Sequence, residues 1–286
     1  MRKYISVLAF GLLLGSYQHA QAQFSRYYFK KHEVGVSLKA GVLQNYGSLP
    51  DQFSADFKFN TAVGLQYDYY VNQKWSLGLG AQYAMQTVDF TATNLKGQSE
   101  KTDWENQNFI FHYDGKNYKE QWKVNQVNIP LTVQYVGEGE MSLYVRTGIQ
   151  YSLVMSSKST LTWNNLETYG FFPQYNLELH KPPFAGFDSQ DEAEYKPDLD
   201  LKDRWAWIAE IGFKYNIKDN QNLYIGAYFD LGLNNQKPSV NETKEKVIDY
   251  RPIENDALEY NSIQQGSKAV FKNYNFGIQL RYGIGL

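Results

Sequence analysis

The amino-acid sequence predicts an all-β fold class: an eight-stranded antiparallel up-and-down transmembrane β-barrel with short periplasmic turns and long extracellular loops. Three observations lead to it. Eight segments alternate large apolar residues with small or polar ones, as strands with two unlike faces do. The connections between these segments are alternately short and long. The second strand face carries glycine and amides, where a water-exposed face would carry lysine and glutamate.

The first four predicted strands are 34–42, 59–71, 75–85 and 127–135. A turn containing Pro, Gly and Ser at 46–58 separates the first two, and the tight connection 72–74 joins the second to the third. The long polar segment 92–120 follows the third strand. Valine, isoleucine, tyrosine and tryptophan recur on the apolar faces, which favours strands.

The fourth strand changes its phase near its beginning. Trp122 and Val124 occupy even positions, whereas Val127 and the apolar residues after it occupy odd positions. One extra residue in a strand produces such a shift, so we expect a β-bulge near Asn125 and Gln126.

The last four predicted strands are 143–153, 205–217, 223–233 and 274–286. Two of their connections are tight, 137–140 before the first of them and 218–222 between the second and third. The other two connections are long and polar, 156–203 and 235–268. Short turns at one end, long loops at the other and an even strand number are typical of bacterial outer-membrane barrels. Both termini then lie at the periplasmic end, and the last strand pairs with the first, which removes the edges of the sheet.

The composition of the second strand face indicates which face meets lipid. A soluble barrel with an apolar interior would show the same alternation. Glycine and amides instead suit a crowded polar interior, because an eight-stranded barrel has a lumen only wide enough for side chains. The apolar face is therefore predicted to meet lipid. Aromatic residues near the strand ends predict two interfacial girdles: Tyr67, Tyr69, Trp75, Tyr135, Tyr215 and Tyr282 at the short-turn end, and Trp122, Trp163, Trp205, Trp207 and Tyr274 at the long-loop end.

Seven charged residues on the polar face form a predicted lumen charge network: Lys39, Asp68, Arg146, Glu210, Lys214, Asp230 and Arg281. A buried charge is costly unless it is paired, so we expect these side chains to pair across the lumen. Arg281 is expected to pair with Glu210 or Asp230. The network is either a structural core or an ion gate, and eight strands favour the first because they leave no continuous aqueous channel.

The N-terminus has the three parts of a secretory signal peptide, assigned to residues 1–22. Arg2 and Lys3 are the basic region, 4–15 is the apolar region, and Ala20-Gln21-Ala22 is the small-x-small cleavage site. Cleavage near Ala22 leaves one mature domain, 23–286, for the outer membrane. The apolar run is about 12 residues long, shorter than a membrane-spanning helix requires.

Composition excludes several classes of function. The chain has no cysteine, which removes disulfides and thiolate chemistry, and its formal net charge of −2 comes without a lysine and arginine stripe for nucleic acid. The three mature histidines, His32, His112 and His180, lack the spacing of a zinc site. We therefore expect no metal, no cofactor and no nucleic-acid partner.

The sequence resembles the PorT-type outer-membrane β-barrel domain family and, more distantly, the small OmpA/OmpX-like barrels. The resemblance is carried by the signal ending AQAQ, the motif VNIPLTVQY at 127–135 and the glycine-rich end LRYGIGL. It covers nearly the whole mature chain and implies the fold and the outer-membrane location. The chain departs from the family by ending on Leu286, where members often end on an aromatic residue, and by its long segments 156–203 and 235–268.

Two classes of function stay open for the long connections. The favoured one is a non-enzymatic surface protein that acts in envelope structure, in surface binding or as an accessory subunit of an outer-membrane assembly. Its partners are outer-membrane lipid and other envelope proteins or a surface ligand. The predicted loop binding surface is an aromatic cluster: Tyr169, Phe171, Phe172, Tyr175, Phe184 and Phe187.

The alternative class is an enzyme at the rim of the loops, a hydrolase or acyltransferase on lipid or peptide. His112 and His180 are its candidate bases because both lie in segments that reach the rim. No nucleophile and orienting acid stand at a defined separation from either histidine, so we expect no catalytic residues. A small pore is the third possibility.

Overall fold

The computed structural model describes residues 30–50, 52–237, 246–252, 257–265 and 269–286. The predicted signal peptide lies outside these residues. Besides strands, the described chain contains two short 3-10 turns, η1 (Pro183–Ala185) and η2 (Ile263–Gln265). No helix in these ranges is long and apolar enough to span a bilayer.

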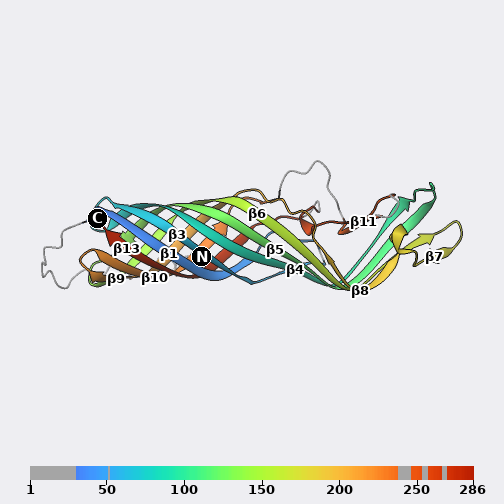
Figure 1. Cartoon of the computed structure of the whole chain (residues 1–286). Coiled ribbons are helices and arrows are strands. Elements are labelled where there is room, and N and C mark those ends of the chain that lie inside the picture. Colours follow the sequence, from blue (N-terminus) through green and yellow to red (C-terminus); the bar gives the residue numbers. More distant parts are fainter. Residues whose placement is uncertain (1–29, 51, 238–245, 253–256, 266–268) are drawn as a thin grey trace, which may run out of the picture.

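Eight antiparallel strands close into a ring, in which each strand pairs with the next and β13 pairs with β1. The register of the closing pair runs from Glu33 opposite Gly285 to Asn45 opposite Asn273. Figure 1 shows the strands crossing the barrel at a tilt, and the predicted eight-stranded up-and-down barrel is confirmed. The ring consists of β1 (His32–Asn45), β3 (Lys58–Tyr70), β4 (Trp75–Thr102), β5 (Asn108–Val136), β6 (Met141–Phe172), β9 (Arg204–Lys218), β10 (Gln221–Gly232) and β13 (Asn273–Gly285).

The three predicted tight connections are confirmed. They join β3 to β4, β5 to β6 and β9 to β10. The first is stabilised by Asn72, whose side-chain oxygen accepts hydrogen bonds from the backbone amides of Lys74 and Trp75, both at 2.9 Å. Such an amide-capped turn lets the chain reverse in four residues, so strands follow each other around the ring.

The outer face of the barrel is apolar and its inner face is polar. Phe59, Leu65 and Ile278 expose 65%, 62% and 64% of their surface, which in a water-soluble protein would be a large hydrophobic patch. The inward side chains Ser37 and Gln82 are buried. This arrangement is the reverse of a soluble barrel and matches the predicted lipid face.

Three strands continue far beyond the barrel. On β4 the last exposed apolar residue of the outer face is Met85, yet the strand runs on to Thr102, roughly 55 Å farther at the rise of a β-strand. β5 and β6 extend with it and pair as far as Ile110 opposite Phe171. The segment 92–120 and the first part of 156–203 were expected to be loops, and this prediction is wrong because both are largely strand.

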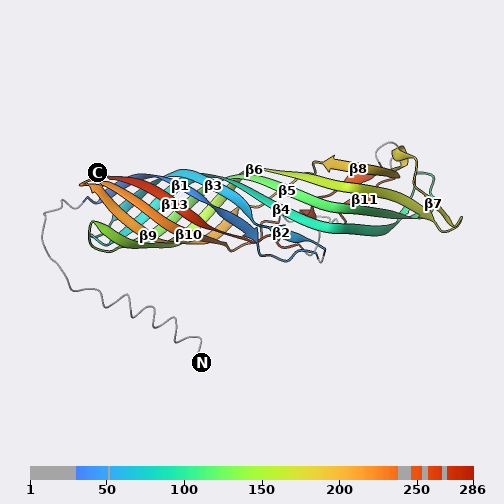
Figure 2. The same ribbon diagram turned by 90° about the horizontal axis from the view of Figure 1, so that it is seen from below.

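We call this part of the molecule the extension: β4, β5 and β6 beyond Met85, with the short strands that pair with them. Figures 1 and 2 both place β7, β8 and β11 at the end of the molecule opposite the C-terminus. β2 pairs with β4, β7 and β8 pair with β6, and β11 pairs with β12 in a separate two-stranded sheet. Their bounds are β2 (Ser54–Asp56), β7 (Leu177–Leu179), β8 (Asp188–Tyr195), β11 (Ile248–Tyr250) and β12 (Leu258–Tyr260).

The polarity of the strand faces inverts where the extension begins. On β4 the inward residues change from Gln82 and Gln86 to Val88 and Phe90, whereas the outward residues change from Met85 to Thr87 and polar residues beyond it. The alternation itself continues through this point. Outside the belt the outer face meets water, so the same strand needs an apolar inner face and a polar outer one.

A β-bulge lies at this level, at the predicted height but on β6, so its assignment to the fourth strand is wrong. The register with β6 shifts between Asn125 and Gln126, but the extra residue is Met155 of β6, since Asn125 pairs with Ser156 and Gln126 pairs with Val154. On β5 the even positions point inward on both sides of this level, so Trp122 and Val124 are buried on the inner face of the extension because the polarity of the two faces inverts. Trp122 and the buried Trp163 were predicted to belong to the outer aromatic girdle, and this is wrong for both. Trp205 and Trp207 are exposed on the barrel surface, as a girdle requires.

The inner face of the extension has a hydrophobic core of its own. Phe90 and Trp122 from the sheet pack on Phe271, with ring centroids 5.7 and 4.7 Å away. Tyr250 of β11 packs edge-on against Phe109 at 4.9 Å. We call residues 246–252, 257–265 and 269–272 the covering segment, because they lie between β10 and β13 in the chain and supply the second layer of this core.

Candidate functional site

A network of buried ions and amides fills the part of the barrel near the short turns. Asp68 of β3 accepts hydrogen bonds from Arg146 of β6 at 2.9 Å and from Arg281 of β13 at 3.1 Å. Gln134 of β5 accepts from the same two guanidinium groups, at 2.8 and 2.6 Å. Gly78 leaves room for this group, because a Cβ there would lie 2.3 Å from an Asp68 oxygen. Large polar side chains therefore face a glycine, as predicted for a narrow lumen.

The other members of the predicted lumen network have other partners. Lys39 is 4.0 Å from Asp230. Lys214 lies over the rings of Tyr70 and Tyr224, with 5.5 and 5.6 Å to the centroids. Glu210 accepts a hydrogen bond from the Tyr144 hydroxyl.

The expected partner of Arg281 is corrected by this arrangement. Glu210 or Asp230 was predicted, whereas the carboxylate that binds Arg281 is Asp68. The guanidinium also lies over the Tyr224 ring at 3.8 Å, so its charge meets a carboxylate, an amide and an aromatic face.

Sequence reasoning missed two polar residues of the lumen. Glu33 of β1 is buried and accepts a hydrogen bond from Tyr224 at 2.9 Å and another from Asn222. Gln134 lies between the two arginines. Both alternate in phase with the other inward residues, and this phase was the available signal.

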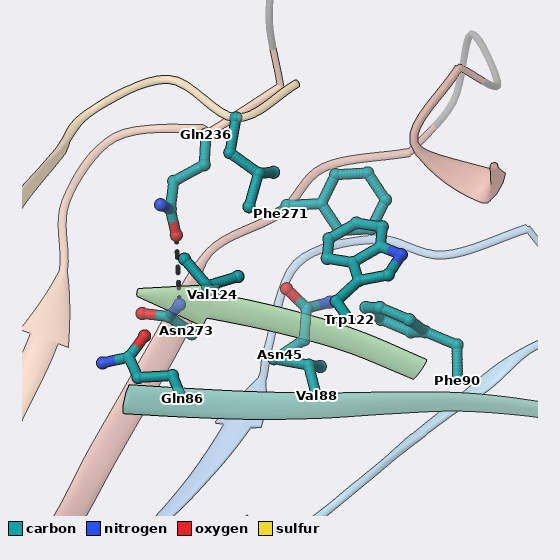
Figure 3. A pocket seen from close by; sticks show the side chains of 10 residues that line it. Asn45, Gln86, Val88, Phe90, Trp122, Val124, Gln236, Phe271 and Asn273 are labelled. Carbon is teal, nitrogen blue, oxygen red and sulfur yellow. Dashed lines mark hydrogen bonds between the residues drawn. The ribbon is translucent and has the colours of Figure 1, made fainter. Parts of the chain in front are cut away.

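A small cavity lies where the barrel meets the extension, and Figure 3 shows the side chains that line it. Asn45, Gln86 and Asn273 line it with amides, and Gln236 accepts a hydrogen bond from Asn273 at 3.1 Å. Its other side is apolar, with Val88, Phe90, Val124, Trp122, Leu201 and Phe271. The cavity therefore lies at the level where the inner face changes from polar to apolar.

Glu120 fastens the covering segment to the sheet. It is fully buried on β5, and its carboxylate accepts hydrogen bonds from five donors. Three belong to the sheet: Tyr118 at 2.6 Å, Trp122 at 2.6 Å and Ser159 at 2.8 Å. The other two come from the covering segment, the Ser262 hydroxyl at 2.5 Å and the Ile263 backbone amide at 3.0 Å. A buried carboxylate with every oxygen occupied by donors makes this junction specific.

The predicted aromatic binding surface is divided by the structure. Phe172 and Phe187 are buried in the core of the extension, where both pack on Phe109 at 5.1 and 5.7 Å. Tyr175 and Phe184 are exposed by 62% and 53%. Phe171 and Tyr169 are half-buried.

The exposed aromatic residues lie in turns at the end of the extension. Tyr175 follows β6, and Phe184 lies in η1. Trp104, exposed by 57%, lies in the turn between β4 and β5 and was not predicted. We call Trp104, Tyr175 and Phe184 the tip residues. A tryptophan in a polar turn, DWENQN, was the available signal.

The two candidate histidines come together around Tyr169. The His112 ring stacks on Tyr169 at 4.7 Å, and the His180 ring stacks on the same tyrosine at 4.8 Å. His180 also contacts Glu167 at 2.9 Å and Glu178 at 3.6 Å. Burial lowers the pKa of His112 from its usual value. The three rings form a ladder across β5, β6 and the residue after β7.

This ladder provides an acid and histidines but no nucleophile. In the described ranges, neither His112 nor His180 hydrogen bonds to a serine or threonine hydroxyl. The same ranges hold no group of three or more histidine and carboxylate residues placed to bind a metal ion. The ladder as it stands therefore provides ring stacking and ion pairing.

Residues 19–237 match the outer membrane protein beta-barrel domain family, and the chain belongs to that family. It is therefore a protein of the outer membrane. No curated protein matches the chain significantly.

Several solved outer-membrane proteins are similar to this chain at low sequence identity. OprG from Pseudomonas aeruginosa is 13% identical, with 89% of this chain and 96% of that chain covered and a TM-score of 0.37. AlkL in lipid bilayers is 12% identical, with 94% and 97% covered and a TM-score of 0.39. The Escherichia coli outer membrane protease OmpT is 10% identical, with 92% and 99% covered and a TM-score of 0.34.

Proposed function

We propose that this chain is a non-enzymatic surface protein that projects its extension from the outer membrane and binds an envelope protein or a surface ligand through it. The observation that supports this most is the extension itself. A protein that only spans the membrane needs no strands beyond Met85, yet β4, β5 and β6 continue there around a separate hydrophobic core. Such a rigid support for exposed residues is typical of binding proteins.

The orientation follows from the lengths of the connections. Short turns lie at the periplasmic end of known outer-membrane barrels. We therefore propose that the short turns and both termini of the mature chain are periplasmic, after cleavage of residues 1–22, and that the extension is extracellular. We also propose that the chain is a PorT-type barrel and that it can act as an accessory subunit of an outer-membrane assembly.

The buried charges in the lumen argue against ion conduction. Asp68, Arg146 and Arg281 are all nearly fully buried, and their side chains meet inside the barrel. Ion passage would require this group to separate, at the cost of exposing unpaired charges in a confined space. We therefore propose a structural role for the network, and no steady conductance in planar bilayers.

A photo-crosslinking experiment in intact cells tests the proposed function. Tyr175 at the tip is replaced by a photoreactive phenylalanine analogue, and Glu138 in a short turn is replaced in a matched control. Adducts with a surface ligand or envelope protein are expected at position 175, and only periplasmic adducts at 138. The adduct at 175 should survive His112→Ala and His180→Ala, because these rings do not act as catalytic bases. Adducts absent at 175, or lost with either histidine, would contradict the proposal.

A further inference from the structure

β4 leaves one edge of its backbone without a partner in the extension. On that side, β3 pairs with residues up to Met85 and β2 pairs with Asp89 to Thr91. From Ala92 to Thr102 no strand of the described chain pairs with this edge. The equivalent edge of β6 is covered by β8 and β7. An open edge of this length is a template for a further strand.

The outward side chains of this edge are arranged symmetrically about Gln98. Lys96 and Glu100, both exposed, lie two residues to either side of it. Asn94 and Thr102, also exposed, lie four residues to either side. If a second copy of the edge pairs antiparallel with Gln98 opposite Gln98, each Lys96 lies opposite a Glu100 of the other copy. Opposite charges on directly facing residues stabilise a pair of strands.

The neighbouring registers lack this complementarity. Centring the pair on residue 97 places Lys96 opposite Gln98, and centring it on 99 places Lys96 opposite Thr102. Charged residues on an edge normally oppose pairing with other strands. Here they exclude unrelated strands and fit a second copy of this chain in one register, which makes the contact isologous.

The free length of the edge also fits this register. The paired stretch runs from Asn94 to Thr102 in both copies. The turn of one copy begins at Asp103, which lies opposite Thr93 of the other copy. On that other copy β2 covers Asp89 to Thr91, so the strand of the first copy ends before it reaches β2. The free edge of β4 is therefore just long enough for the strand of the second copy.

Antiparallel pairing determines where the second copy must lie. β4 runs outward from the barrel, so a strand antiparallel to it belongs to a barrel that points the opposite way (Figure 1). Two copies in one membrane point the same way. Gln98 lies 13 residues beyond Met85, roughly 43 Å at a β-strand rise, which separates the two barrels' belts by up to about 85 Å.

We propose that the β4 edge from Asn94 to Thr102 is a homophilic contact that joins this protein to a second copy in a facing outer membrane. The inference rests on the proposed function in one respect, the extracellular position of the extension. It names a second copy of the chain as the partner of the extension and a surface distinct from the tip residues.

Charge-reversal variants on two vesicle populations test the contact. The mature chain is inserted into preformed phosphatidylcholine vesicles, which keeps the polar extension outside, and red and green vesicles are mixed. Wild-type vesicles should cluster across colours. Lys96→Glu alone and Glu100→Lys alone should reduce clustering at least tenfold, because each places like charges opposite one another. Red Lys96→Glu vesicles mixed with green Glu100→Lys vesicles should cluster again.

The mixed population also controls for local damage. Lys96 pairs with Asp114 of its own chain at 2.5 Å, so Lys96→Glu removes an internal ion pair as well. Recovery by Glu100→Lys on the other vesicle cannot repair that pair, and therefore reports the contact between copies. Clustering of Lys96→Glu vesicles at the wild-type level, or no recovery in the mixture, would overturn the proposal.

A single cysteine tests the register, since the chain has none of its own. Gln98→Cys should form a disulfide between copies in clustered vesicles, because facing residues have Cα atoms within the range a disulfide spans. Glu100→Cys is the matched control: the two positions 100 lie four residues apart along the pair, roughly 13 Å. A disulfide at 100 and none at 98 would sink the register. Loss of these results with intact adducts at Tyr175 would reject the homophilic contact and leave the proposed function standing.

Discussion

Asp68 on β3 and Arg281 on β13 form a buried ion pair at 3.1 Å although β1 lies between their strands. Arg146 on β6 binds the same carboxylate at 2.9 Å. One carboxylate thus ties together three strands that do not pair with one another. A tie of this kind crosses the lumen, so it restrains the cross-section of the barrel as well as the pairing of its sheet.

Replacing Asp68 by Asn should destabilise the barrel strongly. The substitution leaves two buried guanidinium groups without their carboxylate, and breaking a buried pair in this way costs about 3–5 kcal/mol. Urea unfolding in phospholipid vesicles measures the loss. Glu138→Gln is the control, because the Lys74–Glu138 pair at 2.8 Å is on the surface and should contribute under about 1 kcal/mol. Equal stability of the two variants would show that Asp68 does not hold the network together.

Replacing Glu120 by Gln should loosen the covering segment and leave the barrel folded. The amide nitrogen cannot accept the hydrogen bonds that one carboxylate oxygen now accepts, so at least one of Trp122, Ser159, Ser262 and Ile263 loses its acceptor. An unsatisfied buried donor costs about 1–3 kcal/mol. Hydrogen exchange should therefore accelerate in 257–265 while β9 keeps its protection. The partly exposed Glu167→Gln is the comparison, and identical exchange in both variants would contradict the role of Glu120.

Much of the barrel could be predicted because its strands keep one sense of amphipathicity along their length. Strands 205–217 and 274–286 have their large apolar residues on one face, apart from Ile208, and the structure has them as β9 and β13. The change of apolar phase near Asn125 was visible in the sequence, but it comes from the inversion of the two faces of β5, and the extra residue at this level is Met155 of β6.

The extension could not be predicted from the same pattern. Its strands keep the alternation but invert it, so Val88 and Phe90 lie on the inner face where Gln82 and Gln86 lie nearer the barrel. On β4 the apolar residues of the outward phase end at Met85, so the pattern of the barrel strands predicts loops beyond it.

Contacts between residues far apart in the sequence could not be predicted either. Glu120 meets Ser262 across 142 residues, and nothing near either residue indicates the contact. The partner of Arg281 depends on the registers of β13, β1 and β3 together, and the lumen offered several carboxylates of the right phase. The sequence therefore predicts that opposite charges meet in the lumen, but not which residue binds which.

The boundary between lipid and water on β6 can be tested with one substitution at two positions. Ile149→Arg places a cation in the middle of the apolar belt, where arginine costs about 2–4 kcal/mol. Asn164→Arg places it on the exposed outer face of the extension and should change stability by under about 0.5 kcal/mol. Urea unfolding in vesicles of the two variants gives the comparison. A large loss for Asn164→Arg would place the membrane boundary farther along β6.

The ladder of His112, Tyr169 and His180 should make the end of the extension sensitive to acid. Burial lowers the pKa of His112 below 6.5, and the charge of Lys246 lowers it further, whereas Glu178 raises it. The unfolded state then binds more protons than the folded state below about pH 6.5, so stability falls as the pH falls through this range and is regained above it. His112→Phe keeps a ring on Tyr169 and removes the titration.

Hydrogen exchange of the amides around 110–114 and 167–171, corrected for intrinsic rates, measures this effect at pH 5 and pH 7.5. In the wild-type protein, protection should be lower at pH 5. The difference should shrink in His112→Phe, since the ring that gains a proton is absent. His180→Phe is the matched variant: it removes the other stacked ring but leaves His112 to titrate, so part of the difference should persist. Equal pH dependence in wild type and His112→Phe would show that His112 does not couple acid to this end of the molecule.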